Sequence, residues 1–272
     1  MSRGLKDLVI IITDSRGKGI EDYIKENDLE DDFAIVTKVI RGCDVSRAAH
    51  LARSLISSYQ HRNYYCMIFL GICSLTEISR TKRSRSIRYP DQTRVSKVQC
   101  IIEDLKGLKV DFGDRINYPT IIPANLAKFY AYSNPGKSIP ADLPKEQNAL
   151  LEDLNTINSW IKDTNLQSSI TSTVNLSARF FSKSIKKNRK TKSGSKRRVE
   201  KLNDNHLYDG LHLDNSIRST CFGLLFEGAR RDLFRLNVSQ HQPTQETSSD
   251  ESTPEDWDFK RGAVIDALHG NA

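Results

Sequence analysis

The 272-residue sequence lacks the patterns that most directly assign a cofactor or a metal. It has no glycine-rich phosphate-binding loop, no Gly-x-Gly-x-x-Gly dinucleotide pattern, and no histidine and cysteine cluster at zinc-ligand spacing. We therefore expect a protein that works with no cofactor and no bound metal.

Long apolar runs are also missing. The longest, Leu8–Ile12 and Cys66–Leu70, are far too short to span a bilayer, and Met1–Asp7 lacks the apolar region of a signal peptide. The five cysteines form no Cys-x-x-Cys pair, which favours reduced thiols. We expect no membrane span and a cytoplasmic or nuclear location.

Apolar residues make up 38% of the chain and charged residues 28%, which is lean for a globular domain. The net charge of +7 favours an acidic partner, such as nucleic acid. We predict one domain over residues 1–236, with a basic loop at 183–201. The acidic, Ser/Thr-rich stretch 237–272 has the composition of a disordered tail.

Strand-like and helix-like segments alternate in the first part of the chain. Apolar, β-branched runs at 8–12, 33–40 and 64–70 alternate with helical stretches at 20–27 and 45–59. Continuous apolar strands are typical of parallel sheets that are buried on both faces. The order predicts a three-layer α/β/α sandwich with a mostly parallel sheet, of the flavodoxin-like kind.

The second part of the chain is less regular. Residues 80–94 are basic and polar and predict an exposed loop, followed by a helix at 95–105. A short apolar stretch at 118–122 predicts a fourth strand. Helical spacing of apolar residues predicts helices at 143–164 and 215–236.

Asp14-Ser15 directly follows the first predicted strand. Ligand sites of open α/β sheets gather at the carboxyl ends of strands, and free N–H groups of a following helix would stabilise an anion. Ser15 is therefore a candidate nucleophile. Taken alone, the same pair is typical of an ordinary helix cap.

A second candidate pattern is Asp209-Gly210-Leu211-His212, which precedes the last predicted helix. In such a glycine-containing turn the carboxylate can orient the imidazole, which is the arrangement of a Ser-His-Asp triad. Taken alone, this pattern also fits a surface turn.

Together the two patterns resemble the SGNH (GDSL-like) hydrolase family. That family has a Gly-Asp-Ser block after the first strand, a glycine after the second, a Gly-x-Asn block after the third, and an Asp-x-x-His block before the last helix. The corresponding residues here are Thr13–Ser15, Gly42, Gly71–Cys73 and Asp209–His212. The resemblance covers about residues 6–236.

The resemblance implies a site and an activity. Ser15 would be the nucleophile, His212 the base, and Asp209 the group that orients the histidine. The backbone N–H groups of Ser15 and Gly42 would form the oxyanion hole, together with Cys73 at the position of the family asparagine. The expected substrate is a small acyl ester.

Two departures from the family leave alternatives open. Thr13 replaces a glycine, and Cys73 replaces the asparagine by a weak donor. The chain is then either a serine esterase or a catalytically weak SGNH-fold binding module. Asn63 or Asn125 would supply the missing donor only if the fold brings it there. The degenerate blocks also look similar to SGNH-like domains in proteins of animal retroelements.

The basic segment supports three interpretations: a nuclear import signal, a phosphate-binding loop for nucleic acid, or a solvated insertion. It has no aromatic residue on which a base would stack. The candidate nucleic-acid-binding residues are Lys186, Lys187, Arg189, Lys190, Lys196, Arg197 and Arg198.

Overall fold

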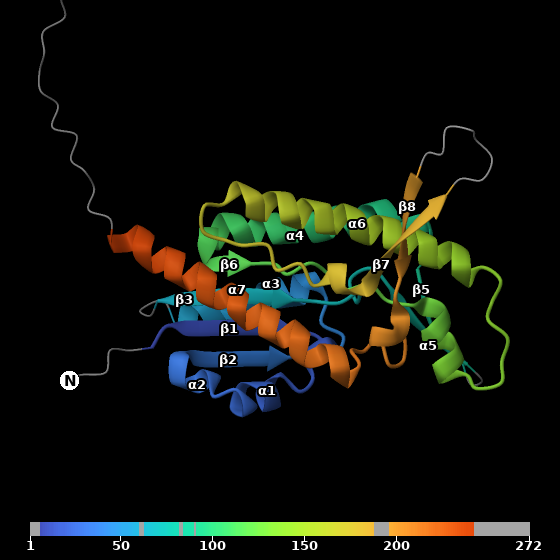
Figure 1. Cartoon of the computed structure of the whole chain (residues 1–272), viewed down its shortest axis with the longest axis horizontal. Helices are drawn as coiled ribbons and strands as arrows, with labels where there is room; N and C mark the ends of the chain where they lie inside the picture. Colours follow the sequence, from blue (N-terminus) through green and yellow to red (C-terminus); the bar gives the residue numbers. More distant parts are fainter. Residues whose placement is uncertain (1–5, 60–62, 82–83, 90, 188–195, 242–272) are drawn as a thin grey trace, which may run out of the picture. The chain divides into compact units, whose positions relative to one another are not determined.

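A four-stranded parallel sheet forms the centre of the fold, with strand order β2-β1-β3-β6 (Figure 1). The strands are β1 (Leu8–Thr13), β2 (Ala34–Val39), β3 (Tyr64–Phe69) and β6 (Ile116–Asn117). The first three confirm the strands predicted from apolar runs. The computed structural model describes the chain except residues 1–5, 60–62, 82–83, 90, 188–195 and 242–272.

The register brings the carboxyl ends of the first three strands to one edge of the sheet. Thr13, the last residue of β1, pairs with Val39 at the end of β2 and with Phe69 at the end of β3. The loops that follow these strands therefore leave the sheet side by side, where a ligand site of an open α/β sheet is expected.

The fourth strand, β6, ends directly before the predicted stretch 118–122, so the predicted position of this strand is wrong. β6 ends at Asn117, and Pro119 has no N–H to donate to a neighbouring strand. Further along, the backbone N–H of Ile121 donates to the side-chain oxygen of Asn158, at 2.7 Å, and not to the sheet.

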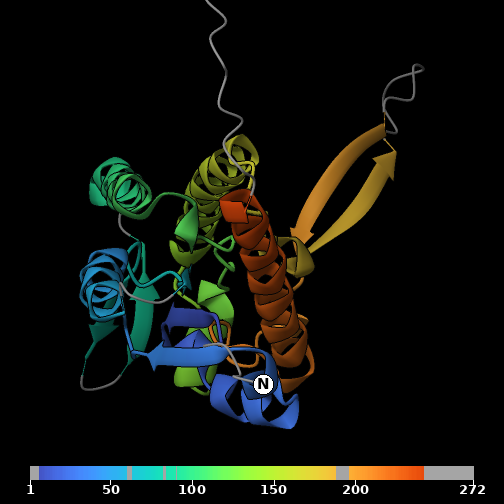
Figure 2. The same cartoon turned by 90° about the vertical axis from the view of Figure 1, so that its left-hand side faces the viewer.

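Helices cover both faces of the sheet (Figures 1 and 2). The described helices are α1 (Ile20–Glu26), α2 (Leu29–Asp32), α3 (Val45–Ser58), α4 (Arg94–Phe112), α5 (Leu126–Ser133), α6 (Leu143–Gln167) and α7 (Asn215–His241). The described 3-10 helices are η1 (Ser15–Gly17), η2 (Asp91–Thr93), η3 (Gly113–Arg115), η4 (Ser177–Phe180) and η5 (Asp204–His206).

The alternating residues of β1 divide the core into two layers. Leu8, Ile10 and Ile12 pack in one apolar cluster with α3, α4 and α6. Val9 and Ile11 point to the other face and pack with α1 and α7. Because β1 is apolar on both faces, it has to lie between two helical layers. The predicted three-layer α/β/α architecture with a mostly parallel sheet is confirmed.

The segment 80–94, predicted as an exposed loop, is largely ordered structure. Strands β4 (Glu77–Arg80) and β5 (Arg85–Arg88) form an antiparallel hairpin, and Ile87 is buried in the core. The many basic residues hid the alternation of apolar and polar side chains that is typical of a strand. The sequence did not predict α5, and α4 and α7 extend beyond the predicted helices.

The basic segment also differs from the predicted loop. Strands β7 (Phe181–Lys187) and β8 (Lys196–Leu202) pair as an antiparallel hairpin, which extends away from the layers in Figure 2. The backbones of Lys186, Lys187, Lys196, Arg197 and Arg198 lie in these strands. Arg189 and Lys190 lie outside the described residues.

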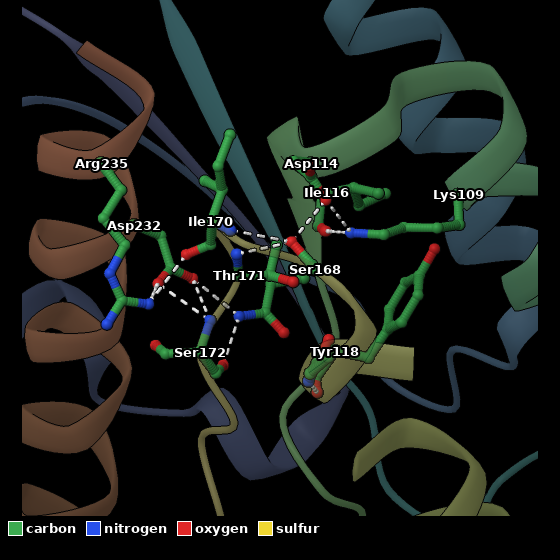
Figure 3. Close-up of polar contacts among 12 residues, drawn as sticks. Lys109, Asp114, Ile116, Tyr118, Ser168, Ile170, Thr171, Ser172, Asp232 and Arg235 are labelled. Carbon is green, nitrogen blue, oxygen red and sulfur yellow. Dashed lines mark hydrogen bonds and ion pairs between the residues drawn. The ribbon is translucent and has the colours of Figure 1, made fainter. Parts of the chain in front are cut away.

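A buried carboxylate connects α7 to the sheet. Asp232 is fully buried, and it accepts hydrogen bonds from the hydroxyl of Tyr65 in β3 and from the side chain of Asn117 in β6. The backbone N–H of Ser172 donates to both of its oxygens, at 3.0 and 3.1 Å. Figure 3 shows the side chains of Asp232 and Arg235 on α7 pointing towards the chain segment that contains Ile170 and Ser172. A buried carboxyl group that accepts hydrogen bonds from this many donors fixes the position of α7 on the sheet.

The segment 168–172, which contains Ser172, is also held by hydrogen bonds on the side away from α7 (Figure 3). Ser168 donates to Asp114 at 2.7 Å and accepts from the backbone N–H groups of Ile170 and Thr171. Asp114 in turn forms an ion pair with Lys109 at 3.1 Å. The chain between α6 and η4 is thus held between α7 and α4.

Replacing Asp232 by alanine should destabilise the fold by about 3 kcal/mol, because it leaves the buried donors of Tyr65 and Asn117 and the part-buried N–H of Ser172 without this acceptor. Urea unfolding followed by circular dichroism measures this change. The matched control is Asp32→Ala, which removes an exposed ion pair with Arg230 and should cost less than about 1 kcal/mol. Equal effects of the two variants would contradict the role of Asp232.

Candidate active site

The loop after β1 presents Ser15 at the first position of η1. Asp14 precedes it, and its Oδ1 accepts the backbone N–H of Arg16 at 2.9 Å. The Oδ2 atom accepts the backbone N–H of Gly71 at 2.9 Å, just after β3. Because Asp14 is buried and bonded at both oxygens, it holds the Ser15 loop against the neighbouring loop.

Two glycines make room for this loop. A Cβ on Gly71 would lie 2.3 Å from Asp14 Oδ2, so only glycine allows the carboxylate this position. A Cβ on Gly17 would lie 2.1 Å from Thr13 Cγ2. Thr13, which departs from the family glycine, is therefore accommodated by the missing side chain of Gly17.

Arg16 connects the loop after β1 to the Asp209–His212 turn. The sequence did not predict this role. Its guanidinium is buried and donates to the carbonyl oxygens of Leu211 at 3.0 Å, Ile122, and Pro123 at 3.3 Å. Burial lowers the pKa of Arg16, while the charge of Asp14 opposes that shift. Nothing in the sequence around Arg16 distinguishes this buried arginine from an exposed one.

The turn Asp209–His212 is built around the carboxylate of Asp209. Oδ1 accepts the backbone N–H groups of Leu211 and His212, at 2.9 and 2.8 Å. Gly210 has a φ of +90°, and a Cβ there would lie 2.4 Å from the carbonyl oxygen of Asn125. The glycine is thus required by both its backbone conformation and its contact with the start of α5.

The structure brings Ser15, His212 and Asp209 together. His212 Nε2 lies 3.1 Å from Ser15 Oγ, although the two residues are 197 positions apart, and His212 Nδ1 lies 2.7 Å from Asp209 Oδ2. Asp209 is buried, whereas the His212 side chain is 37% exposed. Burial opposes ionisation, but the hydrogen bonds from His212 and from the backbone lower the pKa of Asp209 to about 2.

The residues expected around the oxyanion line the same cleft as Ser15 and His212. Gly42 follows β2 in a left-handed turn with a φ of +68°, and no described residue accepts a hydrogen bond from its backbone N–H or from that of Ser15. Cys73 lies after β3, and its thiol is directed at Asp14 Oδ2, at 3.6 Å. Burial and the charge of Asp14 raise the pKa of Cys73 to about 12, so this group is a neutral thiol.

Neither candidate asparagine lies in the wall of the cleft. Asn125 caps α5 by accepting the backbone N–H of Lys128 at 2.8 Å, and it donates to Asp204. Asn63 precedes β3, at the opposite end of the strand, and donates to Asp7 at 2.9 Å. Both amides are therefore engaged elsewhere.

The cleft beside Ser15 has a volume of about 750 Å³. Its walls come from the loops after β1, β2 and β3, from the β4–β5 hairpin, from α5 and from the Asp209–His212 turn. Tyr132 and Tyr208 border it with their hydroxyls 2.6 Å apart. Ile78, Ile87 and Phe129 supply apolar surface.

Two further kinds of feature are absent from the part of the chain that the structure describes. No three histidine, cysteine, aspartate or glutamate side chains there gather in a group that would hold a metal ion. No described helix is long and apolar enough to cross a membrane.

Comparison with known proteins shows the fold. No protein-family model and no curated protein matches the sequence. A lipase/acylhydrolase from Enterococcus faecalis is similar in structure, with a TM-score of 0.51 and 13% identity over 84% of this chain and 96% of that one. The psychrotrophic esterase EstA from Pseudoalteromonas sp. has a TM-score of 0.44 and 13% identity, over 85% and 98%. With its parallel sheet and helical layers, the chain has the SGNH (GDSL-like) hydrolase fold.

Proposed function

We propose that this protein is a serine hydrolase of the esterase type that acts on small acyl esters. The observation that supports it most is the continuous chain of hydrogen bonds from Asp209 through His212 to Ser15. A hydroxyl within reach of an oriented imidazole is the arrangement that activates a serine nucleophile. The similar Enterococcus faecalis protein is a lipase/acylhydrolase, which agrees with this activity.

In the first half of the reaction, Ser15 Oγ attacks the carbonyl carbon of the ester while His212 Nε2 takes the hydroxyl proton. Asp209 stabilises the resulting imidazolium and keeps the ring oriented. The backbone N–H groups of Ser15 and Gly42 donate to the negative oxygen of the tetrahedral intermediate. His212 then gives its proton to the departing alkoxide, which leaves as the alcohol.

In the second half, the acyl group is on Ser15 Oγ. His212 takes a proton from a water molecule, whose oxygen attacks the acyl carbon. The same two backbone donors stabilise the second intermediate. Ser15 recovers its proton from His212, and the free acid leaves. The cleft volume of about 750 Å³ lies within the range of small-molecule sites.

Ser15→Ala should remove hydrolysis of short-chain 4-nitrophenyl esters, with a loss of about a thousandfold or more in kcat, because it deletes the nucleophile. Release of 4-nitrophenol from the purified proteins measures it. The matched control is Ser57→Ala, on the exposed surface of α3, which should keep the wild-type rate. A rate unchanged in Ser15→Ala would contradict the proposal.

A specific observation favours a second candidate, a catalytically weak SGNH-fold binding module. The position of the family asparagine is occupied by Cys73, whose thiol is engaged with Asp14. Loss of one oxyanion donor typically lowers the rate about a hundred- to a thousandfold. In this reading, the cleft still binds a ligand while turnover is slow or absent.

Cys73→Asn should raise kcat for 4-nitrophenyl esters by about tenfold or more, because an amide restores a third donor near the oxyanion. Cys100→Asn, on the exposed face of α4, is the matched control and should not change kcat. Circular dichroism verifies that both variants fold. A folded Cys73→Asn variant that is no faster than wild type would show that this position does not limit the rate.

Because the pKa of Asp209 is low in the folded protein, we expect the free energy of unfolding to decrease in acid. Since the pKa falls from 3.8 to about 2 on folding, the unfolded chain binds more protons between these values and stability decreases as the pH falls. From pH 5 to pH 3 this group alone should contribute a loss of about 1 kcal/mol. Urea unfolding over this range measures the slope, which should be shallower in Asp209→Asn.

The control for this experiment is Asp22→Asn, on the exposed surface of α1. It should leave the pH dependence of unfolding as in wild type. Identical slopes for wild type and Asp209→Asn would contradict an ionised, hydrogen-bonded Asp209 in the native state.

A further inference from the structure

The walls of the cleft are strongly basic. Among the described residues that line it, Asp209 is the sole carboxylate, and it is already bonded to His212. The lining cations are Arg16, Lys18, Arg41, Arg85 and Arg218. An excess of positive charge in a concave site attracts anionic ligands.

These cations differ in how they are engaged. Arg16 donates to three backbone carbonyl oxygens, and Arg218 donates to the carbonyl oxygen of Leu213 at 3.1 Å. Lys18, Arg41 and Arg85 form no ion pair with any carboxylate in the described part of the chain. Of these three, only Arg85 is held by buried neighbours.

The backbone of Arg85 is clamped by one side chain. Asn134, which is 4% exposed, accepts the N–H of Arg85 at 2.9 Å and donates to its carbonyl oxygen at 2.7 Å. The guanidinium carbon lies 5.4 Å from the centre of the Phe129 ring. Asn134 and Phe129 both come from the α5 region, so this helix positions the arginine in the wall of the cleft.

One donor of the Arg85 guanidinium lacks an acceptor in the part of the chain that the structure describes. Its Nε–H is buried and makes no hydrogen bond to any described residue. A buried donor without an acceptor costs free energy, more so when the group is charged. A carboxylate or phosphate in the cleft that Arg85 lines would give this guanidinium an acceptor, in the paired geometry that guanidinium groups favour.

We propose that the substrate is an ester that bears a carboxylate or phosphate group, which Arg85 binds while Ser15 attacks the ester carbonyl. This inference rests on the proposed function and names its substrate class. The apolar side chains of Ile87 and Phe129 line the cleft together with Arg85, so the hydrocarbon part of such a ligand would lie beside them.

Matched pairs of esters test the preference for charge. In the carboxylate pair, 4-nitrophenyl hydrogen glutarate is compared with its neutral methyl ester. In the phosphate pair, 4-acetoxyphenyl phosphate is compared with 4-methoxyphenyl acetate, whose leaving phenol also carries a para oxygen substituent. We expect higher kcat/KM for the anionic member of at least one pair, and the responding pair identifies the anion.

Variants of Arg85 assign the preference to this residue. Arg85→Gln should lower the ratio of anionic to neutral kcat/KM by at least about tenfold, since a charged hydrogen bond is lost. Arg85→Lys should restore part of the ratio. The control is Arg80→Gln, which pairs with Arg85 across the hairpin but is exposed and lies outside the cleft, and it should keep the wild-type ratio.

A binding measurement separates this inference from the proposed function. Isothermal titration of Ser15→Ala with monomethyl glutarate and phenyl phosphate should detect binding, weakened at least about tenfold by adding Arg85→Gln. Anion binding without hydrolysis by the wild type would support the Arg85 site and overturn the esterase. Hydrolysis with equal kcat/KM within both pairs, or a ratio unchanged in Arg85→Gln, would overturn the Arg85 site alone.

Discussion

The geometry of the site depends on the hydrogen bonds that the buried guanidinium of Arg16 donates. Arg16 lies next to Ser15 in sequence and donates to the carbonyl oxygen of Leu211, which lies next to His212. The same group also bonds to the chain just after β6. One side chain thus sets the distance between two segments that are 197 positions apart. Asp14 completes the arrangement by fastening the Ser15 loop to the loop after β3.

Much of the fold could be predicted from the sequence because the central strands have a local signal. The run Leu8–Ile12 is apolar at every position, and such a strand is stable only between two covered faces. The placement of Ser15 beside His212 could be predicted only by combining two short patterns with a family resemblance. Each pattern alone fits an ordinary cap or turn, and the distance between them in sequence carries no geometric information.

The remaining features depend on contacts between distant residues, which a single sequence does not reveal. Ile87 in β5 is buried by α5, a helix that the sequence did not predict. Without this helix, the sequence around Ile87 predicts an exposed loop. Cys73 could be identified as a departure from the family, but its thiol contact with Asp14 could not. The likeness to retroelement domains, the nuclear location and nucleic-acid binding by the basic hairpin stay predictions.

In the proposed mechanism, His212 activates Ser15 as a nucleophile. Reaction with a fluorophosphonate, followed by peptide mass mapping, tests it directly because the reagent reports covalent attack without requiring turnover. We predict one adduct, on Ser15 in the wild type, and its loss in folded His212→Ala. No adduct on Ser15, or equal labelling of the two proteins, would contradict the account.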